Sequence, residues 1–240
     1  MRILFRFFIL FILTIVRIKS ETFSLIVIPD SQTLMAYAPE NFLNQMNWVA
    51  EFSNQLNIAY VAHVGDIVEN HDDTTEWYSA HNGFLILEQL NDENYLQGIP
   101  YGIVPGNHDY PTDNFNRFFG VDRFNQKDYY GGSLLSTKND NNYTFFSKKG
   151  RNFIIINLDH WLDSEISMET KLSWSDSLMN SHKDRGVILV SHNLIIPSFD
   201  NGGIPRFNNY GQSIFDYLKH NANFFMMLTG HRRGEELITK

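Results

Sequence analysis

The chain has 240 residues, of which 43% are hydrophobic and 19% are charged, and its formal net charge at pH 7 is -8. This length and apolar content are enough for one large domain, or two small ones, with a sizeable core. The acidic balance argues against a nucleic-acid surface as the main function, because phosphate backbones select for basic stripes. The chain has no cysteine, so any metal would be held by His, Asn, Gln and carboxylate side chains.

Residues 1–20 have the pattern of a secretory signal peptide. Arg2 gives a positive start, Phe7–Val16 is a short apolar run, and Ser20 is small enough to precede a cleavage site. A membrane-spanning helix needs about 20 apolar residues, which is longer than this run. We therefore expect a cleaved leader, a secreted or lumenal protein without a stable membrane span, and one domain over residues 21–240. An uncleaved N-terminal anchor is the alternative.

Three repeats of strand, loop and helix follow the leader. An apolar run over 23–28 stops before Asp30, and apolar residues spaced three to four apart predict a helix from Pro39 to Leu56. A second strand over 58–64 ends at Asp66, a helix covers 74–90, and a third strand over 99–104 follows. This alternation predicts an α/β fold with a largely parallel sheet.

The second half of the chain is less regular. Residues 115–119 suggest a short helix, and Tyr129–Gly132 indicates a turn or an aromatic wall. A predicted β-hairpin over 143–147 and 153–158 breaks the alternation, so we expect a mixed sheet or a second sheet. The remaining predicted elements are a helix over 167–182, a strand over 187–190, a loop over 200–211, a helix over 213–220 and a strand over 224–228.

Five predicted strands end in a loop that contains a candidate metal ligand: Asp30, Asp66, Asn107 with His108, His192 and His231. The carboxyl ends of parallel strands lie along one edge of a sheet, so these loops should converge on one crevice. A single Asp or His of this kind would be an ordinary turn or structural residue, but their recurrence at one topological position indicates a function. An oxygen and nitrogen ligand set suits Mn, Fe or Zn ions. Two ions that share a carboxylate commonly serve displacement at phosphorus, which predicts hydrolysis of a phosphate ester.

In order and rough spacing, five segments resemble the sequence blocks of the calcineurin-like metallophosphoesterases. These segments are Asp30, Gly65-Asp66, Gly106-Asn107-His108-Asp109, Ser191-His192 and Gly230-His231. The resemblance covers residues 23–235. It implies a four-layer α/β/β/α sandwich, in which two mixed β-sheets are flanked by helices, with a dinuclear metal centre at the strand ends. It also implies that a metal-bridging hydroxide attacks the phosphorus of a phosphomonoester or phosphodiester.

The resemblance assigns a role to each matching residue. Asp66 would bridge two divalent ions, and Asp30 would belong to one of the two sites. The other site would be completed by Asn107, His192 and His231. His108 would protonate the leaving oxygen or donate to the phosphoryl oxygens, and Asp109 would orient it.

Two positions depart from the family's pattern, and both fall on the same metal site. Gln32 stands where the first block normally has a histidine, and Arg233 stands where the last block has its second histidine. A branch of the superfamily has Asp-x-Gln and Gly-His-x-x-Gly-Glu instead, and residues 230–235 match that ending. We expect a weaker or differently tuned site with Asp30, Gln32, Asp66 and water as ligands. Arg233 has two interpretations, a guanidinium that binds the substrate phosphate or a solvated side chain after a turn.

Three functional hypotheses remain open on the sequence. They are a secreted metal-dependent phosphoesterase, a catalytically impaired descendant that binds a phosphorylated ligand, and a structural secretory protein without metal. The chain ends at Lys240, just beyond the last block, where the resemblance implies further strands. A truncated gene product and an incomplete second sheet are both compatible with that ending.

Overall fold

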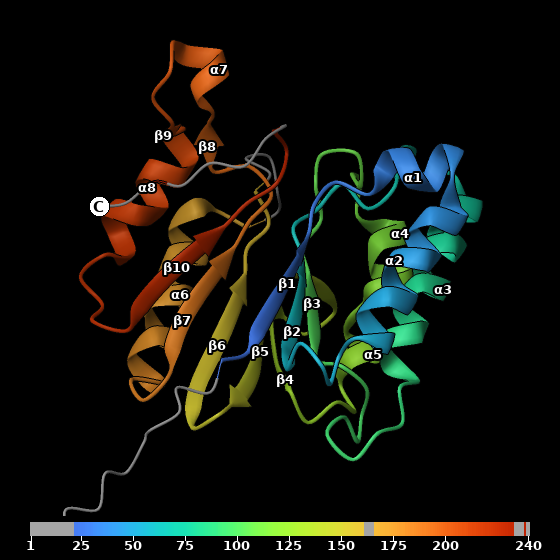
Figure 1. The fold of residues 1–240 in the computed structure, drawn as a ribbon. Helices are drawn as coiled ribbons and strands as arrows, with labels where there is room; N and C mark the ends of the chain where they lie inside the picture. The colour runs from blue at the N-terminus through green and yellow to red at the C-terminus, as the bar shows by residue number, and fades with distance from the viewer. Residues whose placement is uncertain (1–21, 161–165, 233–237, 239–240) are drawn as a thin grey trace, which may run out of the picture.

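The computed structural model describes residues 22–160, 166–232 and 238. Within these residues two β-sheets pack face to face, and helices cover both outer faces, which gives four layers (Figure 1). The expected α/β/β/α sandwich is therefore confirmed. The predicted leader over 1–20 lies outside the described residues, as does Arg233. None of the described helices has the length and apolar character needed to cross a membrane.

The first sheet is built from the three strand, loop and helix repeats. Its strands run in the order β1-β2-β3 and are all parallel, with bounds β1 (Ser24–Ile28), β2 (Ile58–His63) and β3 (Tyr101–Ile103). The parallel sheet predicted from the three repeats is confirmed. The resemblance implied that this sheet would be mixed, and it differs because helical crossovers join its strands. Its outer face is covered by α1 (Gln32–Tyr37), α2 (Pro39–Glu51), α3 (Thr74–Glu88), α4 (Asp113–Phe119) and α5 (Val121–Phe124).

The second sheet is mixed, with the strand order β10-β7-β6-β5-β4. Strands β10, β7 and β6 are parallel, while β6, β5 and β4 are antiparallel neighbours. The strand bounds are β4 (Tyr130–Leu135), β5 (Lys138–Lys148), β6 (Arg151–Asn157), β7 (Gly186–Val190) and β10 (Phe224–Leu228). Helices α6 (Met168–Ser181) and α8 (Asn209–Leu218) pack on its outer face.

The segment that begins at Tyr129 was interpreted as a turn or an aromatic wall, and most of it is strand β4 instead. Tyr130 pairs with Thr144 and Gly132 with Tyr143 in the antiparallel ladder. A side chain at Gly131 would overlap the ring of Tyr143. The glycine that suggested a turn is therefore needed for close packing of an aromatic ring against the strand.

A short excursion between β7 and α8 includes most of the loop predicted over 200–211. It contains a two-stranded ribbon, β8 (Ile195–Ile196) with β9 (Arg206–Phe207), and the one-turn helix α7 (Ser198–Asn201). In Figure 1 this excursion projects from the body of the protein.

An apolar core packs between the two sheets and holds them together. Its buried residues are Ala59, Tyr60, Ala62, Val64 and Val104 on one side and Phe146, Phe153, Ile155, Ile188 and Val190 on the other. Every residue of β2 is buried, as expected for a central strand that is covered on both faces. This packing brings the ends of β2 and β7 together and positions the site described next.

Candidate metal centre

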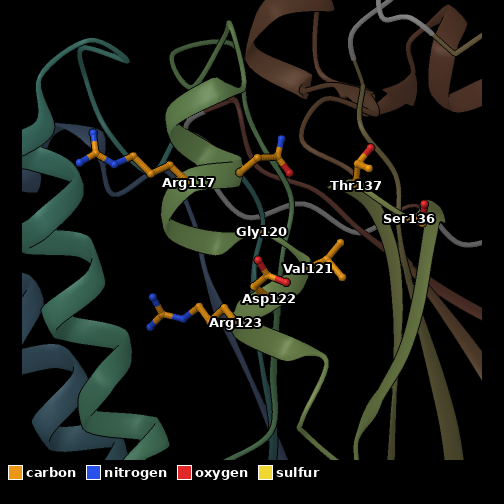
Figure 2. A pocket seen from close by; sticks show the side chains of 8 residues that line it. Arg117, Gly120, Val121, Asp122, Arg123, Ser136 and Thr137 are labelled. Atoms are coloured by element: carbon orange, nitrogen blue, oxygen red, sulfur yellow. The ribbon is translucent and has the colours of Figure 1, made fainter.

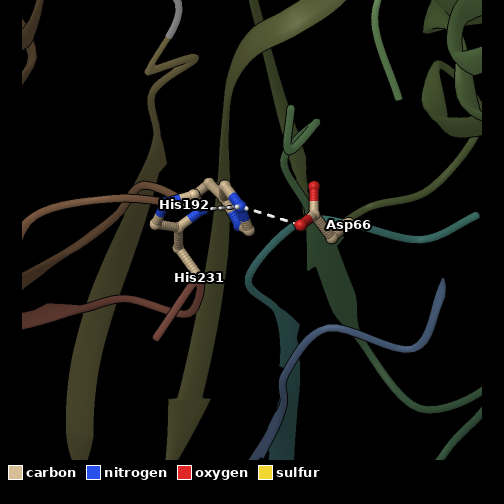
Figure 3. A group of neighbouring side chains, drawn as sticks. All are labelled: Asp66, His192 and His231. Carbon is tan, nitrogen blue, oxygen red and sulfur yellow. Dashed lines mark hydrogen bonds and ion pairs between the residues drawn. The ribbon is translucent and has the colours of Figure 1, made fainter. Parts of the chain in front are cut away.

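The expected ligands gather where the two sheets meet. Asp30 follows β1, Asp66 follows β2 and Asn107 follows β3, whereas His192 and His231 follow β7 and β10 of the other sheet. Ligand atoms of Asp66, His192 and His231 all lie within 4.8 Å of one another. Figure 3 shows the ring of His192 between the other two side chains. Both sheets therefore contribute to one cluster.

His192 is the centre of this cluster. Its Nδ1 lies 2.9 Å from the carbonyl oxygen of Val64. A carbonyl oxygen only accepts hydrogen bonds, so Nδ1 carries the proton and Nε2 of the neutral ring keeps a lone pair. That Nε2 lies 3.2 Å from Asp66 Oδ2, 3.2 Å from Asn107 Oδ1 and 3.1 Å from His231 Nδ1.

These donor atoms fit a divalent metal ion. A carboxylate, an amide oxygen and a second imidazole lie within hydrogen-bonding distance of Nε2 of His192. Such lone-pair donors repel one another unless a proton or a cation lies between them. An oxygen and nitrogen set of this kind suits Mn, Fe or Zn, and a backbone carbonyl that fixes the other ring nitrogen is a common support for a metal-binding histidine.

The charges of the cluster agree with this interpretation. Burial by itself raises the pKa of Asp66, but the hydrogen bond from His192 and its positive charge outweigh burial, so the pKa of Asp66 is lowered. Burial lowers the pKa of His192, but its contacts with Asp66 outweigh burial and the pKa is raised. When the ring of His192 is charged, its Nε2 proton faces Asp66, and metal binding would release that proton.

Asp30 and Gln32 lie beside this cluster and are engaged with the backbone around it. The carboxylate of Asp30 accepts the His231 backbone N–H, with Oδ1 at 2.9 Å and Oδ2 at 3.1 Å. With its amide nitrogen turned toward them, Gln32 can donate to the carbonyl oxygens of Asp30 at 2.8 Å and Asp66 at 3.3 Å. Its amide oxygen is the atom left to serve a metal.

Three of the expected ligands have a left-handed backbone. The φ angles of Asp30, Asp66 and His231 are 35°, 52° and 71°. Such conformations cost on the order of 1–3 kcal/mol each in a residue with a side chain, and they persist at functional sites where the surroundings enforce them. The strain in these three loops supports a functional role for the cluster.

Two glycines allow the loops to approach the ligands closely. A Cβ on Gly65, whose φ is +99°, would lie 2.7 Å from His192 Nδ1. A Cβ on Gly106 would overlap the carboxylate and the backbone nitrogen of Asp66. Any larger residue at either position would displace a candidate ligand.

His108 lies next to the cluster and is partly buried. Its backbone N–H donates to Asp66 Oδ1 at 2.9 Å, and its ring Nδ1 lies 3.0 Å from the carbonyl oxygen of Glu69 and 3.7 Å from the Glu69 carboxylate. Burial lowers the pKa of His108, but the hydrogen bond to Glu69 and the negative charges of Asp66 and Glu69 outweigh burial, so the pKa is raised. Because Nδ1 donates to Glu69, Nε2 is the ring nitrogen that can act on a substrate.

The carboxylate of Asp109 binds backbone groups rather than the ring that we expected it to orient. It is fully buried and accepts hydrogen bonds from the N–H groups of Gly106 at 2.7 Å, Ile67 at 2.9 and 3.1 Å, and Val68 at 3.1 Å. Burial raises the pKa of Asp109 to about 7, and these backbone donors oppose the rise. The contacts join the loop after β3 to the loop after β2, while the described partner of the His108 ring is Glu69.

Sequence reasoning missed two residues at this site. The role of Glu69 was not assigned, because its contact with His108 joins two loops that are distant in the sequence. His160 was not among the predicted site residues. In the structure its ring centroid lies 5.0 Å from that of His192. It follows β6 as the other ligands follow their strands, so the same strand-end rule would have found it.

A separate hollow of about 440 Å³ lies between α4, α5 and the turn that joins β4 to β5 (Figure 2). Arg117 and Arg123 line it, but their guanidinium groups point away from Ser136 and Thr137 on its other side. The Nε of Arg123 donates to Glu88 at 2.8 Å. None of the expected site residues lines this hollow, so it is separate from the metal cluster.

The layered fold and the ligand cluster at its strand ends are those of the metallophosphoesterase class. In agreement with this class, residues 23–231 match the sequence profile of the Calcineurin-like phosphoesterase family, and the chain belongs to that family.

Similar proteins are known from sequence and structure. The chain is 30% identical over 228 residues to the uncharacterized protein YvnB of Bacillus subtilis, a match that covers 90% of this chain and 16% of YvnB. Among solved structures, GAP50, the anchor in the inner membrane complex of Plasmodium, is 18% identical with a TM-score of 0.48, and the match covers 87% of this chain and 65% of GAP50. The purple acid phosphatase PPD1 of yellow lupin is 15% identical with a TM-score of 0.43, and the match covers 79% of this chain and 33% of PPD1.

Proposed function

We propose that this protein hydrolyses phosphate esters with two divalent metal ions bound where its two sheets meet. The observation that carries the proposal is the convergence of Asp66, Asn107 and His231 on Nε2 of His192. The membership of the chain in the Calcineurin-like phosphoesterase family supports the reaction type.

The ligands divide into two unequal sets. One ion would be held by Asp66, Asn107, His192 and His231. The other would be held by Asp30, Gln32 and the shared Asp66, and this set has fewer strong donors because an amide oxygen replaces an imidazole. When bound, divalent ions polarise phosphoryl oxygens and lower the pKa of water, which supplies the nucleophile and stabilises the developing charge.

His108 would protonate the leaving oxygen. The Nδ1 proton is directed at the Glu69 carbonyl oxygen, so a charged ring carries its second proton on Nε2. Burial opposes that charged form, but in the metal-free protein the hydrogen bond to Glu69 and the negative charges of Asp66 and Glu69 raise the pKa of His108 and favour it. A general acid of this kind typically contributes about 10²–10⁴-fold to the rate.

Metal analysis combined with hydrolysis of an aryl phosphomonoester and an aryl phosphodiester tests the proposal. We expect the wild-type protein to bind metal and hydrolyse at least one ester, Asp66→Ala to lose metal and turnover, and His108→Ala to keep metal while its turnover falls. Matched controls are Asp72→Ala and His220→Ala, which remove side chains that are 80% and 61% exposed. Metal without hydrolysis of any ester would favour a ligand-binding descendant, and a protein without metal would contradict both functions.

We also propose that residues 1–20 direct secretion. The basic start and short apolar run of this segment support the proposal. N-terminal sequencing of the protein recovered from the medium should give Glu21 as the first residue. Retention of the protein in membranes with an intact N-terminus would instead indicate an anchor.

A further inference from the structure

Glu76 is a buried carboxylate that contacts the loop after β2. It lies in the first turn of α3, and only 8% of the residue is exposed. Its Oε2 accepts the backbone N–H of Glu69 at 2.7 Å and the backbone N–H of Asn70 at 3.3 Å. Buried carboxylates are rare unless they have partners, and the partners here are two loop amides.

The start of α3 shows that this contact is not ordinary helix capping. Residues 73–76 read Asp-Thr-Thr-Glu, and the side chain of Asp73 caps the helix by accepting the Thr75 N–H at 2.8 Å. In a capping box the glutamate three residues later would return to the backbone N–H of the capping residue. Here the Asp73 N–H donates to the Asn70 carbonyl oxygen at 3.0 Å, and Glu76 reaches the loop instead.

The peptide group between Glu69 and Asn70 connects Glu76 to His108. In a trans peptide the N–H and the C=O lie in one plane and point in opposite directions. The N–H of this peptide faces Glu76, so its carbonyl oxygen, which belongs to Glu69, points away and accepts the hydrogen bond from His108 Nδ1 at 3.0 Å. A rotation of this one peptide would remove the partner of the His108 ring.

Two further side chains hold the next residue of the same loop. The indole N–H of Trp77 donates to the His71 carbonyl oxygen at 2.9 Å, and the amide of Asn114 donates to the same oxygen at 2.7 Å. Trp77 and Asn114 therefore fix the loop one residue after the peptide that contacts His108. At that peptide, Glu76 accepts the hydrogen bond from the Asn70 N–H.

We propose that Glu76 is a positioning residue for His108, which it acts on through the peptide between Glu69 and Asn70. The proposal rests on the proposed role of His108 as the acid that protonates the leaving oxygen. An ester whose leaving group is a poor one, such as an alkoxide, needs that proton, whereas a p-nitrophenolate leaving group does not. Loss of Glu76 should therefore slow alkyl esters more than p-nitrophenyl esters.

Glu76→Ala and Glu76→Gln provide the test, with Glu40→Ala as the matched control. Glu40 lies in the first turn of α2 and is exposed, so its removal changes helix electrostatics without a loop contact. For Glu76→Ala we expect turnover of an alkyl phosphate ester to fall about tenfold to hundredfold, and turnover of the p-nitrophenyl ester to fall by about twofold. Glu76→Gln keeps an oxygen that can accept both N–H groups, so it should remain within about threefold of wild type on both esters. Metal content should be unchanged in all three variants.

Nitrogen NMR of the Zn²⁺-loaded protein separates this inference from the proposed function. At a pH high enough to leave the ring neutral, the signal of His108, assigned by its absence in His108→Ala, should show the proton on Nδ1 in wild type and Glu76→Gln and a mixture of forms in Glu76→Ala. If Glu76→Ala does not fold, Glu76→Asp, which withdraws the carboxylate by one methylene, takes its place. An unchanged His108 signal, or equal losses on the two esters, would overturn the positioning role. A wild-type protein that hydrolyses no ester would contradict the proposed function, and the NMR signal would still decide the role of Glu76.

Discussion

Replacing Asp109 by alanine should destabilise the protein strongly, because the Asp109 carboxylate holds two loops of the site together. The side chain is fully buried and accepts the backbone N–H groups of Gly106, Ile67 and Val68. Alanine would leave these three donors buried without their acceptor. Each such donor costs about 1–3 kcal/mol, so we expect the free energy of unfolding to fall by at least about 3 kcal/mol.

Urea denaturation of the wild-type protein and of the variant measures this loss. Asp109→Asn keeps one carboxyl oxygen and should lie between the two. Asp113→Ala is the matched control, because Asp113 is exposed in the first turn of α4 and its removal should cost about 0.3–1 kcal/mol. The contrary result is an Asp109→Ala variant that unfolds at the same urea concentration as the wild type and yet has no turnover. That result would contradict the proposal that Asp109 holds the two loops together, and it would support the expected role of Asp109 as the group that orients His108.

Three further predictions concern the ligands and the buried histidines. Gly65→Ala places a Cβ against the ring of His192 and should weaken metal binding about 10- to 100-fold by calorimetric titration, whereas Gly150→Ala, at a φ of +74° but with nothing within 4 Å, should leave it unchanged. Gln32→His should strengthen binding of the weaker ion about tenfold or more, and equal affinities for two ions in the wild-type protein would contradict the proposed difference between the sites. Burial lowers the pKa of His63 to about 3 from 6.5, so below pH 6.5 the unfolded chain takes up a proton that the folded protein does not. The contribution of His63 to stability should therefore fall by about 2 kcal/mol between neutral pH and pH 5 in metal-free protein, and the fall measured by denaturation should be smaller in His63→Gln by that amount.

The parts of the site that could be predicted from the sequence are those that depend on local pattern. Apolar runs that stop at Asp66, His192 and His231 identified strand ends, and the parallel arrangement of such ends explains why these residues meet. The same rule applied to β6 would have included His160.

The parts that were missed depend on contacts between distant segments. Strand β4 contains Gly131 and Gly132, which favour a turn locally, and only its pairing with β5 makes it a strand. The backbone donors around Asp109 and the contact of Glu69 with His108 join loops about 40 residues apart, with a sequence separation of 42 for Ile67 and 39 for Glu69. No periodicity or spacing in the sequence encodes such contacts.

Anomalous X-ray diffraction from crystals grown with Mn²⁺ or Zn²⁺ would show whether the cluster around His192 binds metal. We expect the strongest metal peak within coordination distance of Asp66, Asn107, His192 and His231, with a second and weaker peak beside Asp30. A saturated crystal with no peak at the His192 cluster, or with its strongest peak elsewhere on the protein, would contradict the assignment of this cluster as the metal centre.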